Sequence, residues 1–203
     1  MSTTQRRPAH RPSRRGVIVE TAFDLFATGA VTDVTVADIA SAAGMTSAAI
    51  YYHYPSREEI LLEGLREFSA AYIGEVGRIT AEESIPHGSL DTLVPSLGRW
   101  LEDNRTQAVV YFVTARGSSL LVEALRRENT VALIPILSSA ARKIRGKLSA
   151  AEAGVIAVAL IAQIEVFASS MLSKDSVFET LGRKRFVDTA ARLSERIAGS
   201  TAG

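Results

Sequence analysis

The stretch from Thr35 to Ile60 constrains the fold more than any other part of this 203-residue chain. It predicts two short helices joined by a tight turn and followed by the start of a longer helix. Thr35 is a favourable N-cap, and Asp38 three positions later completes the pattern of a capping box. Gly44 stands where a helix ends in a left-handed residue, a conformation that glycine adopts at little cost.

The second helix of this stretch is short and has clear boundaries. Thr46 can cap it at once, and it extends over residues 47–54. Pro55 stops it, because the residue before a proline is pushed out of the α region. Ser56 and Glu59 then predict a second capping box, which opens the long helix.

A helix, a glycine-containing turn and a helix form the DNA-binding helix-turn-helix, whose second helix enters the major groove. The small residues from Thr46 to Ala49 let the helix backbone approach DNA, and its free N–H groups favour a phosphate. Tyr51, Tyr52 and His53 can donate hydrogen bonds to phosphates. An ordinary corner between two helices, filled by an aromatic plug, has the same spacing, so these residues alone leave both interpretations open.

The stretch resembles the N-terminal domain of the TetR family of transcriptional repressors over about residues 14 to 65. The matching residues are Ala22, Phe23, Leu25, Phe26, Gly29, Thr35, Val36, Ile39, Ala40, Ala43, Gly44, Thr46, Ile50, Tyr51, His53, Tyr54, Ser56, Arg57, Glu58 and Leu61. The resemblance implies a DNA-binding domain. Many relatives carry Lys at the position of Ser47 and often Gly-Thr in place of Ala48 and Ala49, so one phosphate contact expected of the family is missing here.

Residue types and position select the candidate DNA contacts. They are Arg14, Arg15, Thr35, Thr46, Ser47, Ala48, Ala49, Tyr51, Tyr52, His53 and Arg57. Arg57 lies in the first turn of the long helix, where a cation gains nothing from the helix dipole. A phosphate contact would explain this position, and a chance surface arginine is the alternative.

The charge distribution says more than the net charge of +1. Five arginines and no acidic residue lie in the first 15 residues, which leaves a net charge of −4 elsewhere, and residues 16–56 contain no Lys or Arg. Residues 1–13 predict a disordered basic arm. Such arms reach into a minor groove beside a recognition helix, although a solvated leader without a role is the alternative.

Helical spacing continues through the rest of the chain, and no strand pattern of useful length occurs. We therefore predict an all-α fold of about nine or ten helices, with a helix-turn-helix domain over 14–58 and a helical effector-binding and dimerisation domain over 59–203. The predicted helices cover 14–28, 56–80, 90–103, 106–115, 120–145 (kinked or split at Pro135), 152–172, 183–198 and a single turn at 176–181.

The helix over 152–172 is apolar on nearly all sides. Such a helix is buried on most of its faces. In a dimer it would be covered by the protein's own core on one side and by a partner subunit on another, whereas in a monomer the core alone would cover it. With the last helix it would form a symmetric dimer interface like the four-helix arrangement of the family. The candidate interface residues are Ile156, Leu160, Ile164, Phe167, Met171, Phe186, Ala190 and Leu193.

The effector pocket is harder to locate. Its candidates are Trp100, Tyr111, Phe112, Arg116, Gln163 and Phe167, each of which could equally be plain core. Glu165 lies within the apolar helix, and a buried carboxylate is costly unless it is paired. Its partner could be a ligand, an arginine such as Arg116 or Arg99, or a group on a second subunit.

Patterns typical of enzymes are missing from the sequence. His10, His53 and His87 have no metal-ligand spacing, and the chain contains neither G-x-S-x-G nor a glycine-rich phosphate loop. We expect no enzymatic activity, no metal and no cofactor other than an unknown small-molecule effector. The longest apolar run has ten residues, whereas a membrane span needs about 20, and the absence of Cys fits a cytoplasmic protein without membrane contacts.

These features and the resemblance together predict a dimeric, ligand-responsive repressor that binds a palindromic DNA operator. One alternative is an all-α small-molecule carrier or enzyme that keeps the helical corner without DNA function. Another is an architectural protein that binds DNA through its arm without sequence selectivity. Binding to random duplex compared with specific DNA separates the three.

Deleting residues 1–13 should weaken DNA binding and make it less dependent on salt. The deletion removes Arg6, Arg7 and Arg11. If all three neutralise phosphates, the slope of log K against log salt should fall by about 2.7 per arm. A salt titration of DNA affinity measures this, and an unchanged slope would show that the arm is idle.

Overall fold

The computed structural model describes residues 13–81, 90–173 and 177–199, and these residues form helices and no strand. The elements are α1 (Arg14–Phe26), the 3-10 turn η1 (Val31–Asp33), α2 (Val36–Ala42), α3 (Ser47–His53), α4 (Arg57–Ile79), α5 (Leu93–Asp103), α6 (Arg105–Val109), the π-helical segment η4 (Val110–Thr114), α7 (Leu120–Arg145), α8 (Ala150–Leu172), α9 (Val177–Leu181) and α10 (Arg183–Ala198). The predicted all-α fold is confirmed. The predicted arm before Ser13 and the loop containing His87 lie outside the described residues.

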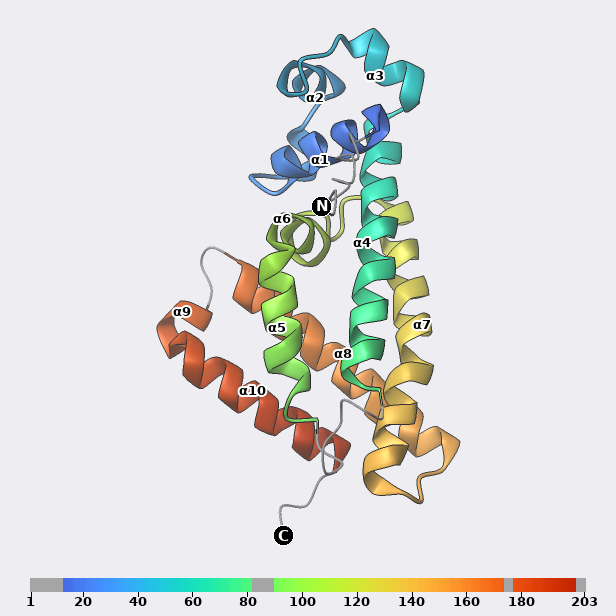
Figure 1. Ribbon diagram of the computed structural model, residues 1–203, viewed down its shortest axis with the longest axis vertical. Helices are drawn as coiled ribbons and strands as arrows, with labels where there is room; N and C mark the ends of the chain where they lie inside the picture. The colour runs from blue at the N-terminus through green and yellow to red at the C-terminus, as the bar shows by residue number, and fades with distance from the viewer. Residues whose placement is uncertain (1–12, 82–89, 174–176, 200–203) are drawn as a thin grey trace, which may run out of the picture.

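The helices form a small head and a larger body. Figure 1 shows α1, α2 and α3 together at one end of the molecule, with α4 running from this head down along α7. The body consists of α4 to α10, in which α7 and α8 make the most extensive contact and α10 packs across α5 and α8.

Most of the predicted helix boundaries agree with the structure. The capping boxes of Thr35 with Asp38 and of Ser149 with Glu152 both form. Of the capping box predicted for Ser56 and Glu59, one bond forms: the Ser56 hydroxyl oxygen accepts from the Glu59 N–H at 3.2 Å. Gly44 adopts φ 64°, as a left-handed helix end requires.

The structure differs from three local predictions. The first helix was predicted to extend to residue 28, but α1 stops at Phe26, and Thr28 donates to the Leu25 carbonyl with its N–H and its hydroxyl. Of the kink or split predicted at Pro135, the split does not occur, because α7 continues through it. The segment predicted as one helix over 106–115 changes from α6 to the π-helical η4, where the Ala115 N–H donates to the Val110 carbonyl at 2.9 Å.

One close contact joins α4 to the head. A Cβ at Gly64 would lie 2.2 Å from the Phe23 ring and 2.8 Å from Val19, so α1 rests directly on the backbone of α4. Further along the same helix, Phe68 and Tyr72 are buried in the body. A single helix therefore contributes to the cores of both the head and the body.

The helix α8 is long and apolar enough to cross a membrane, but the core helix of a soluble protein can have the same length and composition. Half of its most apolar window is buried inside the structure. This burial accounts for much of its hydrophobic character.

Replacing Gly64 with Ala should destabilise the protein by about 1 to 3 kcal/mol, because the new methyl group overlaps Phe23 and Val19. Gly74→Ala in the same helix is the matched control, since a Cβ there meets nothing within 4 Å. That variant should gain about 0.5 to 1 kcal/mol from helix propensity. Urea unfolding measures both, and equal effects would contradict the close packing of α1 on α4.

Candidate functional site

The helix α3 presents one buried and one exposed side. Ile50 is fully buried and anchors α3 in the head, while Tyr51 and Tyr52 are 55% and 87% exposed. The Tyr52 and His53 rings meet edge to face, with centroids 5.1 Å apart. α3 thus has an exposed aromatic surface at the end of the molecule farthest from the body (Figure 1).

The N-terminus of α3 keeps its first backbone donors at the surface. Thr46 accepts a bond from the Ala49 N–H at 3.2 Å, Ala48 is exposed, and Ser47 is half-buried. The free N–H groups of a helix start attract anions. Thr35 caps α2 in the same way and is also exposed.

Arg15 connects three helices of the head. Its Nη1 donates to the His53 carbonyl at 2.9 Å, its guanidinium pairs with Glu63 of α4, and its Cζ lies 4.2 Å from the centre of the Tyr54 ring. The Tyr54 hydroxyl donates to Glu63 at 2.7 Å. These bonds hold the C-terminal end of α3 against α1 and α4, so the exposed Arg15 side chain helps to fix the orientation of α3.

This network shifts the acidity of its members. Burial acts to raise the pKa of Glu63, but the hydrogen bonds from Arg15 and Tyr54 outweigh it and hold the pKa below its usual value. Burial first, and then the bond to Glu63, raises the pKa of the Tyr54 hydroxyl well above its usual value. Glu63 is therefore a carboxylate at neutral pH, and Tyr54 is a neutral donor.

Arg57 also has internal partners. Its Nη1 donates to the carbonyls of Thr32 and Val34, at 2.7 and 2.9 Å, and so fixes the turn that leads into α2. These bonds explain its position in the first turn of α4 without a phosphate. Arg14, by contrast, is exposed at the start of α1.

The comparisons agree with this geometry. The family profile described as "Bacterial regulatory proteins, tetR family" matches residues 18–63, which cover α1 to the first part of α4. The HTH-type transcriptional repressor KstR2 of Mycolicibacterium smegmatis is 31% identical over 104 residues, which is 51% of each chain. Over residues 18–63 the chain is therefore similar to the tetR family of bacterial regulatory proteins. It spans about half the length of the curated relatives it matches.

Solved structures share the whole fold. The fatty acid degradation regulator FadR from Bacillus halodurans has a TM-score of 0.71 and 14% identity, over 96% of this chain and 99% of the other. FadR from Bacillus subtilis, solved in complex with stearoyl-CoA, has a TM-score of 0.67 and 16% identity, over 91% and 97%. The fold of these structures, including both the head and the body, is therefore shared over 91% to 96% of this chain.

The predicted interface side of α8 was wrong. Ile156, Leu160, Ile164, Phe167 and Met171 are all buried in the core of the chain itself. The exposed apolar side of the helix consists of Val155, Val158, Ala162 and Val166. Because α8 is apolar nearly all round, its sequence pattern did not reveal which side faces outward.

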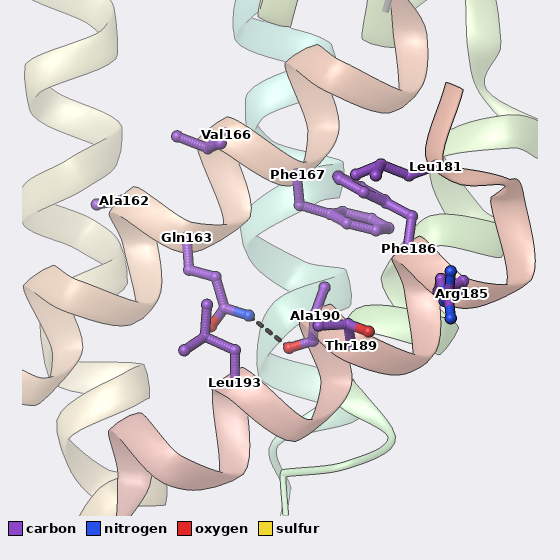
Figure 2. Close-up of a pocket in the computed structure, with 10 residues that line it drawn as sticks. All are labelled: Ala162, Gln163, Val166, Phe167, Leu181, Arg185, Phe186, Thr189, Ala190 and Leu193. Carbon is purple, nitrogen blue, oxygen red and sulfur yellow. Dashed lines mark hydrogen bonds between the residues drawn. The ribbon is translucent and has the colours of Figure 1, made fainter. Parts of the chain in front are cut away.

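A surface groove of about 590 Å³ lies between α8, α9 and α10. Figure 2 shows Gln163 on α8 pointing toward Ala190 and Leu193 of α10, and the Phe167 and Phe186 rings stacked, while Val166 and Ala162 point away from α10. The Gln163 Nε2 donates to the Ala190 carbonyl at 2.6 Å, and the Ser194 hydroxyl donates to the Gln163 Oε1 at 3.0 Å. Among the predicted interface residues, Phe167, Phe186, Ala190 and Leu193 line this groove.

The six predicted effector residues lie in three places and do not form one pocket. Trp100, Tyr111 and Phe112 join Phe68 and Tyr72 in an aromatic cluster inside the body, with ring centroids 4.7 to 6.5 Å apart. Gln163 and Phe167 line the groove beside α10. Arg116 lies after η4, with its Nη2 3.9 Å from Glu165.

Glu165 is an internal partner, and its main contact was missed in the sequence. Arg126 is 7% exposed, and its Nη2 lies 3.2 Å from both carboxylate oxygens of Glu165. Its Nη1 donates to the Tyr111 carbonyl at 2.7 Å, so one side chain joins α7, α8 and η4. Arg126 falls on the buried side of α7 with Val122, Asn129 and Leu133, and this helical spacing is the signal that would have identified it.

Glu63→Gln should lower the free energy of unfolding by about 1 kcal/mol at pH 7, because the amide replaces a charged partner of Arg15. The folded pKa of Glu63 is depressed, so its contribution is present above the unfolded value of about 4.3 and is lost as pH falls through the folded value. The difference from wild type should therefore shrink in acid. Glu67→Gln, at an exposed position of α4, should show little effect at any pH. Urea titrations at several pH values test this, and a constant difference would contradict it.

Proposed function

We propose that the protein is a dimeric DNA-binding transcriptional repressor controlled by a small-molecule effector. The observation that carries the proposal is the α3 surface, where Tyr51 and Tyr52 are exposed while Ile50 on the opposite side is fully buried. Large aromatic side chains exposed on a helix-turn-helix need a partner, and their hydroxyl groups suit phosphates.

The helix α3 would enter the major groove with its N-terminus foremost. Thr46, Ala48 and Ala49 bring the backbone close to DNA, and Tyr51 and Tyr52 donate to flanking phosphates. Because the charge of Arg15 is offset by Glu63, the electrostatic attraction would come from Arg14, Arg57, the preceding basic residues and the helix N-termini. Arg15 and Arg57 would act indirectly, by holding α3 and the turn before α2 in position.

A second copy of the chain would cover the apolar side of α8 and the groove beside α10. Val155, Val158, Val166, Leu181 and Leu193 are all exposed there, and an apolar surface of this extent is typical of a subunit interface. In such a dimer the two recognition helices would lie about 34 to 36 Å apart, one turn of B-DNA.

The effector would act on the interior of the body. The aromatic cluster around Tyr72 and Tyr111 holds a Tyr72 hydroxyl that is buried without a hydrogen-bond partner among the described residues. Phe68 and Tyr72 belong to α4, which also packs on α1 through Gly64. An effector that separates these rings would move α4 and shift the population toward a head spacing that no longer fits the operator.

The direct experiment is binding of the purified protein to the DNA upstream of its own coding region, compared with random duplex at near-physiological salt. Selective binding with two protomers per site is expected. Equal affinity for both duplexes would favour the architectural alternative. Failure to bind either one at low salt would favour a carrier.

Tyr52→Phe should reduce operator affinity about tenfold, because it removes one hydroxyl donor to a phosphate. Tyr52 is 87% exposed, so the melting temperature should not change. Fluorescence anisotropy with labelled operator measures the loss, and unchanged affinity would exclude Tyr52 from the interface.

Val166→Glu should convert the dimer to a monomer, because it places two charges in the apolar contact. Val131→Glu is the matched control, since Val131 is 68% exposed on α7 and Val166 is 65% exposed on α8. Analytical ultracentrifugation separates the outcomes. If Val131→Glu gave a monomer and Val166→Glu stayed dimeric, the interface would lie on α7 and the proposed α8 interface would be wrong.

A further inference from the structure

A second cavity lies where the head meets the body. It encloses about 470 Å³ between the end of α1, the helix α6, the segment η4 and the end of α8. The head contributes Ala27, Thr28 and Gly29, and the body contributes the remaining walls. This volume lies within the range of small-molecule sites, and such sites often occur between domains.

The lining contains one charged side chain, that of Arg105, and no carboxylate. Arg105 is exposed, and it makes no hydrogen bond or ion pair to the described residues. It differs in this from Arg15, Arg57 and Arg126, which all have partners within the protein. A guanidinium at the edge of a cavity is suited to bind a carboxylate through two parallel bonds.

A polar atom in the wall also lacks a partner. The Thr114 hydroxyl is buried and has no hydrogen-bond partner among the described residues. Thr114 ends the π-helical segment, in which the Val110 carbonyl already accepts the Ala115 N–H. π-helical turns of this kind are frequent at functional sites. The Thr114 hydroxyl is therefore a donor that a ligand in this cavity could satisfy.

The remaining walls are mostly apolar. Val109 and Val113 line the body side of the cavity, and Leu172 at the end of α8 lines it as well. An apolar wall beside an unpaired cation accommodates a molecule with one anionic end and one hydrocarbon part.

We propose that this cavity is a binding site for a small amphipathic carboxylate, with the carboxylate on Arg105 and the hydrocarbon part against Val109, Val113 and Leu172. The site is distinct from the aromatic cluster around Tyr72. Because its walls belong to both the head and the body, the bound acid would also restrict how α1 sits on α6.

The test uses the full chain without DNA, so its result does not depend on the proposed regulatory function. Phenylacetate and hexanoate are titrated by calorimetry, with phenylacetamide and hexanamide as neutral counterparts. Both acids should bind, and each amide should bind at least about tenfold more weakly. Amide resonances of Thr28, Thr106 and Val113 should shift in two-dimensional NMR spectra when acid is added.

Two variants examine the walls. Arg105→Gln should weaken acid binding about tenfold, whereas Arg99→Gln, at an exposed arginine on α5, should leave it unchanged. Thr114→Val should stabilise the fold, because it removes an unpaired buried hydroxyl, and should weaken acid binding several-fold. Equal binding of acid and amide, full binding by Arg105→Gln, shifts confined to other residues, or no acid binding up to about 10 mM would each overturn the proposal.

Discussion

The packing of α1 on the backbone of α4 at Gly64 is the contact on which the rest of the structure depends. Phe23 and Val19 occupy the space that a side chain at this position would need, so the two helices approach more closely than any other residue would allow. Because α4 continues to Phe68 and Tyr72 in the body, one rigid helix contributes to the packing of both the head and the body.

Two of the arginines of the head have structural roles that their sequence positions did not suggest. Arg15 and Arg57 were both predicted to contact DNA, and both donate to carbonyls inside the head. The charge of Arg15 is offset by Glu63, whereas Arg57 donates to neutral carbonyls and keeps its charge. In the proposed complex with DNA, the cations near α3 would be Arg57, Arg14 and the arginines that precede it, because residues 16–56 contain no Lys or Arg.

The body combines two kinds of interior. Around Tyr72 and Tyr111 the rings pack against one another, while beside them Arg126 and Glu165 form a partly buried ion pair that joins α7 to α8. Breaking such a pair would leave a buried charge uncompensated, so it fixes the relative position of the two helices. Outside, α8 exposes Val155, Val158 and Val166, and Val166 also lines the groove beside α10 (Figure 2).

The sequence by itself determined the local features: the caps at Thr35, Thr46 and Ser149, the turn at Gly44, the buried stripe of α4 and the all-α class. Each of these depends on neighbours within about one helical turn, where spacing is a sufficient guide. Only the tertiary structure decided which side of α8 faces outward, that Arg126 pairs with Glu165, and that the end of α1 and α6 enclose a cavity. These features bring together residues far apart in the chain, and a helix that is apolar on every side carries no periodic signal of its orientation.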